Sequence, residues 1–291
     1  MRVIQRVDPD EIYNFGGHGA EAESFDEPEH TLRTDALGAL HFLESLRLSA
    51  RRDVRYLQAT SAAVFGTRPG LPVTEATRFE PTSPYAVAKA CGHWMTRIYR
   101  DTHGLFACSA IFFDHESPLR GRDGPLRRIS RGLATVLCGG AEVLALPALD
   151  TRHDIGCARD FVHGAWLMLQ QATPADYVLA TGEMRSLREL VSITAEEMGL
   201  GLEWRLHDGL ELGVVKHALG AAAGLEPGRV VVRAPQCDTR REAPGLQGDA
   251  RQAFDALGWA PTRSILDLAR EMAAADLDAA LRGRACRGEF R

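Results

Sequence analysis

Short apolar runs alternate with amphipathic stretches along the first half of the chain. Leu32, Ala36, Leu40, Leu43 and Leu46 recur at nearly helical spacing after Pro28, which predicts a helix that opens at that proline. The other predicted elements are strands at 11–15, 54–60 and 105–113, and helices at 83–103 and 126–137. This alternation predicts an α/β protein with a parallel sheet.

The pattern loosens after Asp150. Shorter elements are predicted at 177–180, 186–198 and 229–233, with a final helix from 264 to about 281. The segment 207–227 is rich in Gly, Ala and Pro, which indicates a surface excursion. We therefore predict a core domain at 1–150 and a smaller substrate-binding lobe at 151–291, with some late segments returning to the core.

Composition narrows the class of protein. The 291 residues are 45% hydrophobic, enough for one globular body with two unequal lobes. A net charge of -5 gives no electrostatic footprint for nucleic acid, and no apolar run reaches the length of a membrane span. The six cysteines and ten histidines lack paired or metal-ligand spacing, so we expect reduced thiols and no metal site. Without a signal-peptide pattern, we expect a cytoplasmic protein.

Tyr85 and Lys89 stand four positions apart in the predicted helix 83–103 and so share one face. There an ammonium can lower the pKa of the phenol and hold a cofactor ribose, which suits a Tyr acting as general acid or base. Ser61 follows the predicted strand 54–60 and could reach the same substrate oxygen. A Tyr-x-x-x-Lys pair alone is a weak signal, since an exposed helix pair also explains it.

Longer motifs give the pair its context. They are Pro9-Asp10-Glu11-Ile12-Tyr13-Asn14, Ser83 to Lys89, His115-Glu116-Ser117-Pro118, Arg159-Asp160-Phe161-Val162, Ala180-Thr181-Gly182 and Leu257-Gly258-Trp259. Together these motifs resemble the GDP-mannose 4,6-dehydratase family of extended short-chain dehydrogenases/reductases, almost from end to end. The resemblance implies a truncated doubly wound, Rossmann-like parallel sheet and a lyase that uses NADP on a GDP-linked hexose.

The resemblance implies that the sugar is oxidised at C4, loses a C5 proton and water from C6, and regains hydride at C6. Tyr85 and Lys89 match the catalytic Tyr and Lys, and Ser61 takes the place of a catalytic Thr with its hydroxyl kept. The family's Ser-Thr-Ser-Glu run is Thr60-Ser61-Ala62-Ala63 here, so alanine replaces the Glu that acts on C5 and C6. We therefore expect dehydration to be impaired.

The resemblance also implies two groups of cofactor-binding residues. Lys89, together with His115 and Arg120, matches NADP-binding positions. A further stretch corresponds to the family's Leu-Gly-Ala-Met-Ser: Phe15, Gly16, Gly17, His18 and Gly19. The Gly-rich first strand-turn-helix that binds the pyrophosphate does not appear, so we expect no tight NADP binding by the chain as written.

Four positions are implied to contact the sugar nucleotide. Asp114 replaces an Asn, which places a carboxylate before an anionic ligand. Arg127 belongs to a basic helix face with Arg128 and Arg131 that could meet a diphosphate, although a solvated helix face explains it equally well. Arg152 neighbours the position of a family Arg that is His153 here, and Glu242 is the one residue retained from an Arg-Pro-Ala-Glu run.

The missing first segment has a physical consequence. In the strand order 3-2-1-4-5-6, its loss leaves the strand at 11–15, normally central, as an edge. Exposed edges pair or aggregate, so we expect poor solubility, completion by a related dehydratase subunit, or a homo-oligomer. Alternatively the true start lies about 70 residues earlier, with an intact nucleotide loop.

Three functional hypotheses stay open. The first is an active or weakly active dehydratase, against which Ala63 argues. The second is a keto-sugar-nucleotide reductase or epimerase, which needs Ser61, Tyr85 and Lys89 but no Glu at position 63. The third is a pseudoenzyme that binds a partner subunit or a nucleotide sugar. We favour the dehydratase family for identity and the non-catalytic role for the chain as written.

Overall fold

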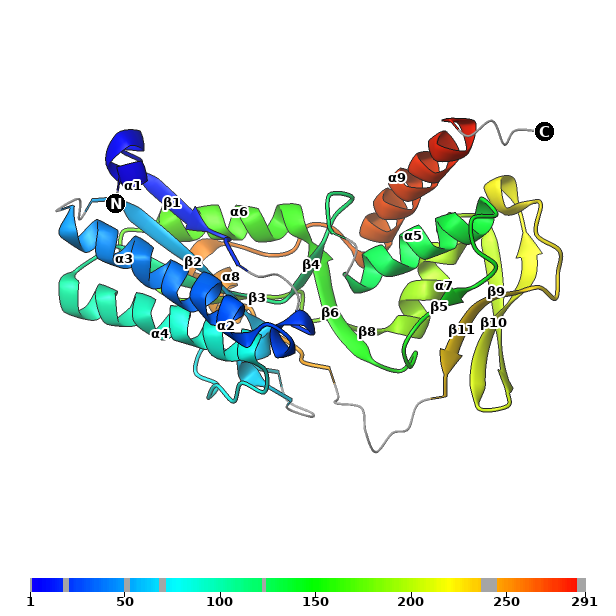
Figure 1. The fold of residues 1–291 in the computed structure, drawn as a ribbon, viewed down its shortest axis with the longest axis horizontal. Helices are drawn as coiled ribbons and strands as arrows, with labels where there is room; N and C mark the ends of the chain where they lie inside the picture. Colours follow the sequence, from blue (N-terminus) through cyan, green and yellow to red (C-terminus); the bar gives the residue numbers. More distant parts are fainter. Residues whose placement is uncertain are drawn as a thin grey trace. The chain divides into compact units, whose positions relative to one another are not determined.

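The computed structural model describes residues 2–17, 21–49, 53–67, 72–121, 124–236 and 245–286 (Figure 1). The chain divides into two compact units, and each unit consists of segments that are separate in the sequence. The first unit comprises Met1–Asp114, Arg159–Gly182 and Leu246–Pro261; the second comprises His115–Ala158, Glu183–Gly245 and Thr262–Arg291. The assignment of a core to 1–150 and a substrate lobe to 151–291 stays a prediction.

A four-stranded parallel sheet forms the centre of the first unit. Its order is β1-β2-β3-β7, with bounds β1 (Glu11–Asn14), β2 (Arg55–Ser61), β3 (Ala107–Phe112) and β7 (Tyr177–Leu179). Glu11 pairs with Arg55, Tyr56 with Ala107, and Ala110 with Tyr177. The predicted parallel sheet is confirmed, and among the described residues β1 lies at one end of it, as expected.

Helices cover both faces of this sheet (Figure 1). Because side chains alternate along a strand, Tyr56 packs with Leu43 and Tyr99 of the α3–α4 face, while Leu57 packs with Phe161 of α6 on the other. The helical elements of this unit are α1 (Arg2–Val7), η1 (Glu23–Phe25), α2 (Pro28–Thr31), η2 (Leu32–Leu37), α3 (Gly38–Leu48), η3 (Ala62–Phe65), α4 (Pro84–His103), α6 (Ala158–Leu169) and α8 (Arg251–Leu257).

The helix predicted from Pro28 contains a π turn. Pro28 occupies its first turn as expected, but residues 32–37 form the π segment η2 before α3 begins at Gly38. The wider turn changes the phase of the side chains, so Leu32 is exposed while Asp35 and Ala36 are buried. The regular helical spacing predicted from Leu32 to Leu46 is therefore interrupted in the structure.

Local sequence sets both ends of α4. The Ser83 side chain accepts a hydrogen bond from the Ala86 N–H at 3.1 Å, and Pro84 occupies the first turn, where no N–H is needed. Gly104 follows the helix with φ of 65°, a left-handed conformation that favours glycine. The predicted helix 83–103 is therefore confirmed, with Ser83 as its cap.

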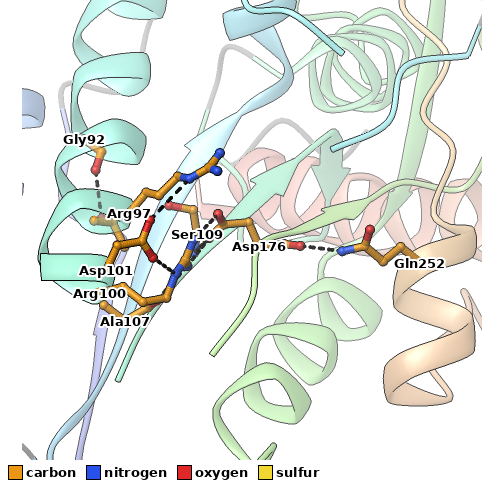
Figure 2. A network of polar contacts seen from close by, with 9 residues as sticks. Gly92, Arg97, Arg100, Asp101, Ala107, Ser109, Asp176 and Gln252 are labelled. Atoms are coloured by element: carbon orange, nitrogen blue, oxygen red, sulfur yellow. Dashed lines mark hydrogen bonds and ion pairs between the residues drawn. The ribbon is translucent and has the colours of Figure 1, made fainter. Parts of the chain in front are cut away.

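A partly buried ion pair connects α4 to the sheet and to α8 (Figure 2). The Arg100 guanidinium donates two hydrogen bonds of 2.8 Å to the Asp176 carboxylate and one of 2.9 Å to the Ala107 carbonyl. Asp176 also accepts from the Ser109 N–H at 2.8 Å, and its carbonyl accepts from Gln252 at 3.0 Å. The far end of α4 is thus fixed to β3 and to the loop before β7.

The second unit has its own sheets and core. One sheet has the order β5-β11-β10-β9 and another the order β4-β6-β8. Its elements are β4 (Asp114–Glu116), α5 (Pro125–Leu137), β5 (Leu144–Ala145), β6 (Arg152–Cys157), β8 (Met184–Ser186), α7 (Leu187–Glu197), β9 (Leu200–His207), β10 (Leu210–Ala218), η4 (Gly220–Ala222), β11 (Val230–Pro235) and α9 (Ile265–Cys286). Leu133, Leu190 and Met272 join α5, α7 and α9 in one core.

The segment 207–227, predicted as a surface excursion, contains a β-hairpin strand, β10 (Leu210–Ala218). β9 and β10 pair in antiparallel fashion around Asp208 and Gly209, whose φ values are 47° and 72°. Two successive positive φ angles are typical of the tight hairpin turn that Asp-Gly favours. The prediction missed the strand 210–218 because the Gly and Ala content outweighed this dipeptide. Within the described ranges, no helix combines the length and apolarity that crossing a bilayer demands.

Candidate functional site

The chemistry-bearing residues of the first unit gather at the carboxyl ends of its parallel strands. Phe15, Gly16 and Gly17 follow β1, and Ser61 is the last residue of β2. The N-terminal half of α4 supplies Tyr85 and Lys89, and α4 packs against η3, which follows Ser61. In open α/β sheets, ligands bind at this end of the strands.

Tyr85 and Lys89 lie one turn apart on α4, as predicted. The Lys89 Nζ atom is 5.5 Å from the centroid of the Tyr85 ring. Lys89 is 6% exposed, and burial lowers the pKa of its ammonium below the ordinary value, against the opposing effect of the Asp35 carboxylate. The pair therefore has a geometry in which a cation can act on the phenol.

Asp35 is the site residue that sequence reasoning missed. It lies in the π turn η2, is 1% exposed, and places Oδ1 3.6 Å from Lys89 Nζ. No sequence motif assigned Asp35 to a site, although a carboxylate is rarely buried without a partner. That partner could not be identified from spacing, because Asp35 and Lys89 are on different helices.

The glycines after β1 allow a close backbone approach. A Cβ added at Gly17 would fall 2.2 Å from Asp35 Oδ1 and 2.9 Å from Lys89 Nζ. The Gly16 N–H donates to Asn14 Oδ1 at 3.2 Å, and the Phe15 ring lies 5.5 Å from the Phe112 ring, tilted by 37°. Gly17 is thus held against the Lys89–Asp35 pair. His18 and Gly19 lie outside the described residues.

Ser61 ends β2 and caps the short helix η3. Its Oγ accepts a hydrogen bond of 3.2 Å from the Ala63 N–H. Both residues are half-buried, and the side chain at position 63 is a methyl group. The turn that presents Ser61 is therefore formed, but it carries no acid or base at the position of the family's Glu.

The start of α4 is held by the segment that precedes α2. Ser83 Oγ donates a hydrogen bond of 2.6 Å to Glu21 Oε1, and the Tyr85 N–H donates to Ser24 Oγ at 3.2 Å. Ser24 in turn donates to the Glu21 carbonyl at 2.6 Å. These contacts fix the backbone that carries Tyr85, and no sequence motif predicted them.

Other predicted ligand residues have different surroundings. Asp114 is exposed at the boundary of the first unit. In the second unit, His115 is half-buried, and Arg120 is exposed, with its N–H bonded to the Ser117 carbonyl at 2.9 Å. Arg152 donates a 2.8 Å hydrogen bond to the Met184 carbonyl across β6 and β8. Glu242 lies outside the described residues.

Arg127 is paired within the second unit. Its Nη1 atom lies 2.9 Å from Oδ1 of Asp276 on α9, and Ser130 Oγ donates a 2.5 Å hydrogen bond to Oδ2 of the same carboxylate. Burial raises the pKa of Asp276, while Ser130 and Arg127 act in the opposite direction. The solvated helix face considered for Arg127 is therefore replaced by a largely buried ion pair.

Fold and site together define a Rossmann-like α/β protein with a Tyr-x-x-x-Lys helix at the ligand-binding end of its sheet. A family model described as GDP-mannose 4,6 dehydratase matches residues 1–272. The chain belongs to this family, as the sequence motifs indicated.

Named relatives agree with this assignment. GDP-mannose 4,6-dehydratase of Vibrio cholerae serotype O1 is 39% identical over 282 residues, which cover 96% of this chain and 76% of the relative. The Sinorhizobium fredii enzyme of the same name is 40% identical over 278 residues, covering 95% and 77%.

Solved structures share the fold. RMD from Pseudomonas aeruginosa, complexed with NADPH, has a TM-score of 0.76 at 22% identity and covers 93% of this chain and 82% of its own. The UDP-glucose 4-epimerase of Thermotoga maritima has a TM-score of 0.75 at 16% identity, covering 96% and 80%. At these identities the likeness supports the Rossmann-like fold with its C-terminal lobe.

Proposed function

We propose that this chain binds a GDP-linked hexose, keeps the groups that move hydride and proton at C4, and is impaired in dehydration. The observation that carries the proposal is the contrast at the end of β2. Ser61 is presented on a formed turn and Tyr85 and Lys89 stand together on α4, while position 63 is alanine. The chain is then a relative of the family's lyases that keeps the groups for oxidation at C4 and lacks the group for elimination.

NADP is the proposed cofactor, and the described residues fit one end of it. Gly16 and Gly17 let the backbone come close at the end of β1, and Lys89 supplies a cation for ribose hydroxyls. When bound, the dinucleotide would supply the hydride acceptor. His115 and Arg120, in the second unit, are proposed as further contacts.

Each proposed catalytic residue has a defined task at C4. The Tyr85 phenolate takes the proton of the C4 hydroxyl as hydride leaves C4, so that a ketone forms. The Lys89 ammonium favours the phenolate because opposite charges attract at short range. Ser61 Oγ donates a hydrogen bond to the same sugar oxygen. No step in this half requires a carboxylate at position 63.

The elimination of water does require a carboxylate at position 63. Removal of the C5 proton needs a base, and departure of the C6 hydroxyl needs an acid. The Ala63 methyl group supplies neither, and loss of a positioned acid/base costs about 10²- to 10⁴-fold in rate. Glu75 does not replace this carboxylate, because it accepts a 2.7 Å hydrogen bond from the Val178 N–H in β7.

Ala63→Glu tests this proposal by a gain of function. We expect the variant to form a 4-keto-6-deoxy sugar nucleotide from GDP-mannose about 10²-fold or more faster than the parent chain, measured by product chromatography with NADP. Ala62→Glu, one position away on η3, is the matched control and should give no gain. Binding of GDP-mannose and NADPH is measured on the same samples by calorimetry.

The outcomes separate the alternatives. Rapid dehydration by the parent chain would contradict the proposed impairment. Ligand binding with keto-sugar reduction but no gain in Ala63→Glu would favour the reductase or epimerase hypothesis. Folded protein that binds neither ligand would overturn the proposal and leave a subunit-partner role.

A further inference from the structure

Buried polar side chains gather on one face of the parallel sheet in the first unit. Tyr56 is 0% exposed, Gln58 1% and Asn14 7%. Tyr56 and Gln58 stand two positions apart on β2 and so point to the same face, and Asn14 of β1 is the register partner of Gln58. A polar group buried in this way is costly unless it is hydrogen-bonded, so each of the three needs a partner within the protein.

The three side chains form one hydrogen-bonded network. Tyr56 Oη donates to Gln58 Oε1 at 2.5 Å, and Asn14 Nδ2 donates to the same oxygen at 2.8 Å. Asn14 Nδ2 also donates to Tyr56 Oη at 3.1 Å. Gln58 Nε2 donates to the Ala59 carbonyl at 3.1 Å, and the Gly16 N–H donates to Asn14 Oδ1 at 3.2 Å. The network therefore runs from the backbone of β2 to the turn that follows β1.

The backbone at each end sets the direction of these hydrogen bonds. The Ala59 carbonyl can only accept, so the amino group of Gln58 faces it and Oε1 faces Asn14. Asn14 must then present Nδ2 to Gln58, which leaves Oδ1 for the Gly16 N–H. With the Asn14 carboxamide turned over, two oxygens would face each other and two N–H donors would meet. The network thus selects one orientation of this carboxamide.

Packed groups cover the network and keep it in place. The Tyr56 ring lies 6.2 Å from the Phe42 ring, and Gly92 of α4 lies against Gln58, since a Cβ at Gly92 would be 3.6 Å from Gln58 Nε2. Burial raises the pKa of Tyr56 well above its ordinary value, so the hydroxyl keeps its proton and remains a donor at neutral pH. In a closely packed interior, such side chains have little freedom to rearrange.

Gly16 is where the network meets the proposed cofactor site. The next residue, Gly17, lies so close to the active-site helix that an added Cβ would be 2.9 Å from Lys89 Nζ. Glycine allows a close approach, but it also has more backbone freedom than any other residue. Two successive glycines therefore need an outside constraint to hold one conformation, and the hydrogen bond from Gly16 to Asn14 supplies it.

We propose that Gln58 and Tyr56 are positioning residues, which fix the Asn14 carboxamide so that it holds the Gly16 N–H and keeps the turn after β1 in the conformation that NADP binding needs. This inference rests on the proposed function, since NADP is the ligand proposed to approach these glycines. Gln58 and Tyr56 act through Asn14 and are assigned no contact with substrate or cofactor.

The sequence allows the Gly16 amide to be observed almost alone. Phe15-Gly16 and Phe65-Gly66 are the only two Phe-Gly dipeptides in the chain. Protein labelled with ¹³C at the Phe carbonyl and ¹⁵N at Gly therefore gives two signals in a carbonyl-correlated NMR spectrum. Phe15→Leu, at an exposed position, removes the Gly16 signal and so assigns it. The Gly66 N–H, which donates to the Ala63 carbonyl at 3.1 Å, serves as the internal reference for hydrogen exchange.

We expect Gln58→Met to make the Gly16 amide exchange about 5-fold faster, because the net contribution of about one hydrogen bond is lost, and to leave Gly66 unchanged. Tyr56→Phe removes one hydroxyl from the network and should cause a smaller change in the same direction. Tyr13→Phe is the matched control, since it removes a tyrosine hydroxyl of β1 whose hydrogen bond lies outside the network. Circular dichroism confirms that each protein is folded.

NADPH binding, followed by NADPH fluorescence, is the second readout. Gln58→Met should raise the Kd for NADPH about 5-fold and leave the Kd for GDP-mannose unchanged, a split that general destabilisation would not produce. Tyr13→Phe should leave both constants unchanged.

The outcomes distinguish the inference from the proposed function. Unchanged Gly16 exchange in folded Gln58→Met and Tyr56→Phe proteins would overturn the inference. Faster exchange with unchanged NADPH binding would overturn it as well, because the conformation of the turn would then not matter to the cofactor. Faster exchange in a protein whose parent chain binds no NADPH would instead retain the ordering of the turn and reject the cofactor part of the proposed function.

Discussion

At the level of single residues, two largely buried ion pairs show that a charged side chain is buried together with a partner of opposite charge. Lys89 is partnered by Asp35 and Arg127 by Asp276, and each pair joins two different helices. Breaking such a pair leaves an uncompensated buried charge, which costs more than the pair contributes. The arginine proposed to meet a diphosphate therefore also has a structural task in the second unit.

Arg127→Met separates these tasks. We expect it to reduce the free energy of unfolding by about 3 kcal/mol in urea titrations at pH 7, because Asp276 is left buried without its cation. The loss should shrink as the pH falls, since protonation removes the Asp276 charge and burial already raises its pKa. Arg128→Met, on the exposed side of α5, should change stability by less than about 0.5 kcal/mol. Equal effects of the two substitutions would contradict this account.

At the element scale, α4 is held at both ends by different means. Ser83 and its contact with Glu21 fix the end that carries Tyr85 and Lys89, and the Arg100–Asp176 pair fixes the other end to the sheet (Figure 2). A helix fixed in this way presents its active-site residues without freedom to slide. The contacts that do this come from loops and strands far away in the sequence.

Asp176→Asn tests the stabilising effect of the Arg100–Asp176 pair through the pH dependence of the free energy of unfolding. Burial alone would raise the pKa of Asp176, but hydrogen bonds and the charge of Arg100 outweigh it and hold the pKa below the ordinary 3.8. The carboxylate thus contributes stability above that value, and the contribution is lost as the pH falls through the folded pKa. We expect the variant's free energy of unfolding to be about 3 kcal/mol lower at pH 7 and to change less as the pH falls. Asp101→Asn, whose side chain is 61% exposed, is the control and should behave like the parent chain.

At the scale of the whole molecule, the two units have separate cores, and the residues proposed to contact ligands are found in both of them. The first unit contains Ser61, Tyr85 and Lys89, and the second contains His115, Arg120 and Arg127. A binding test therefore uses the whole chain of 291 residues.

Calorimetry on purified 1–291 measures the binding of each ligand directly. We expect GDP-mannose to bind and NADPH to bind more weakly than a micromolar constant, because the described residues fit only one end of the dinucleotide. Tight NADPH binding would reject this expectation. Sedimentation velocity on the same sample tests the proposed self-association, and a single monomeric species would contradict it.

The amino-acid sequence alone was enough to predict the strand-helix alternation, the start of α4, and the positions of Ser61, Tyr85, Lys89 and Ala63. These follow from local periodicity, from turn chemistry and from motifs that occupy contiguous residues. The tertiary structure decided which distant side chains meet: Asp35 with Lys89, Asp276 with Arg127, and Asp176 with Arg100. Such pairs depend on how helices cross and on a π turn that changes the phase of one helix, and neither is encoded in the spacing of neighbouring residues.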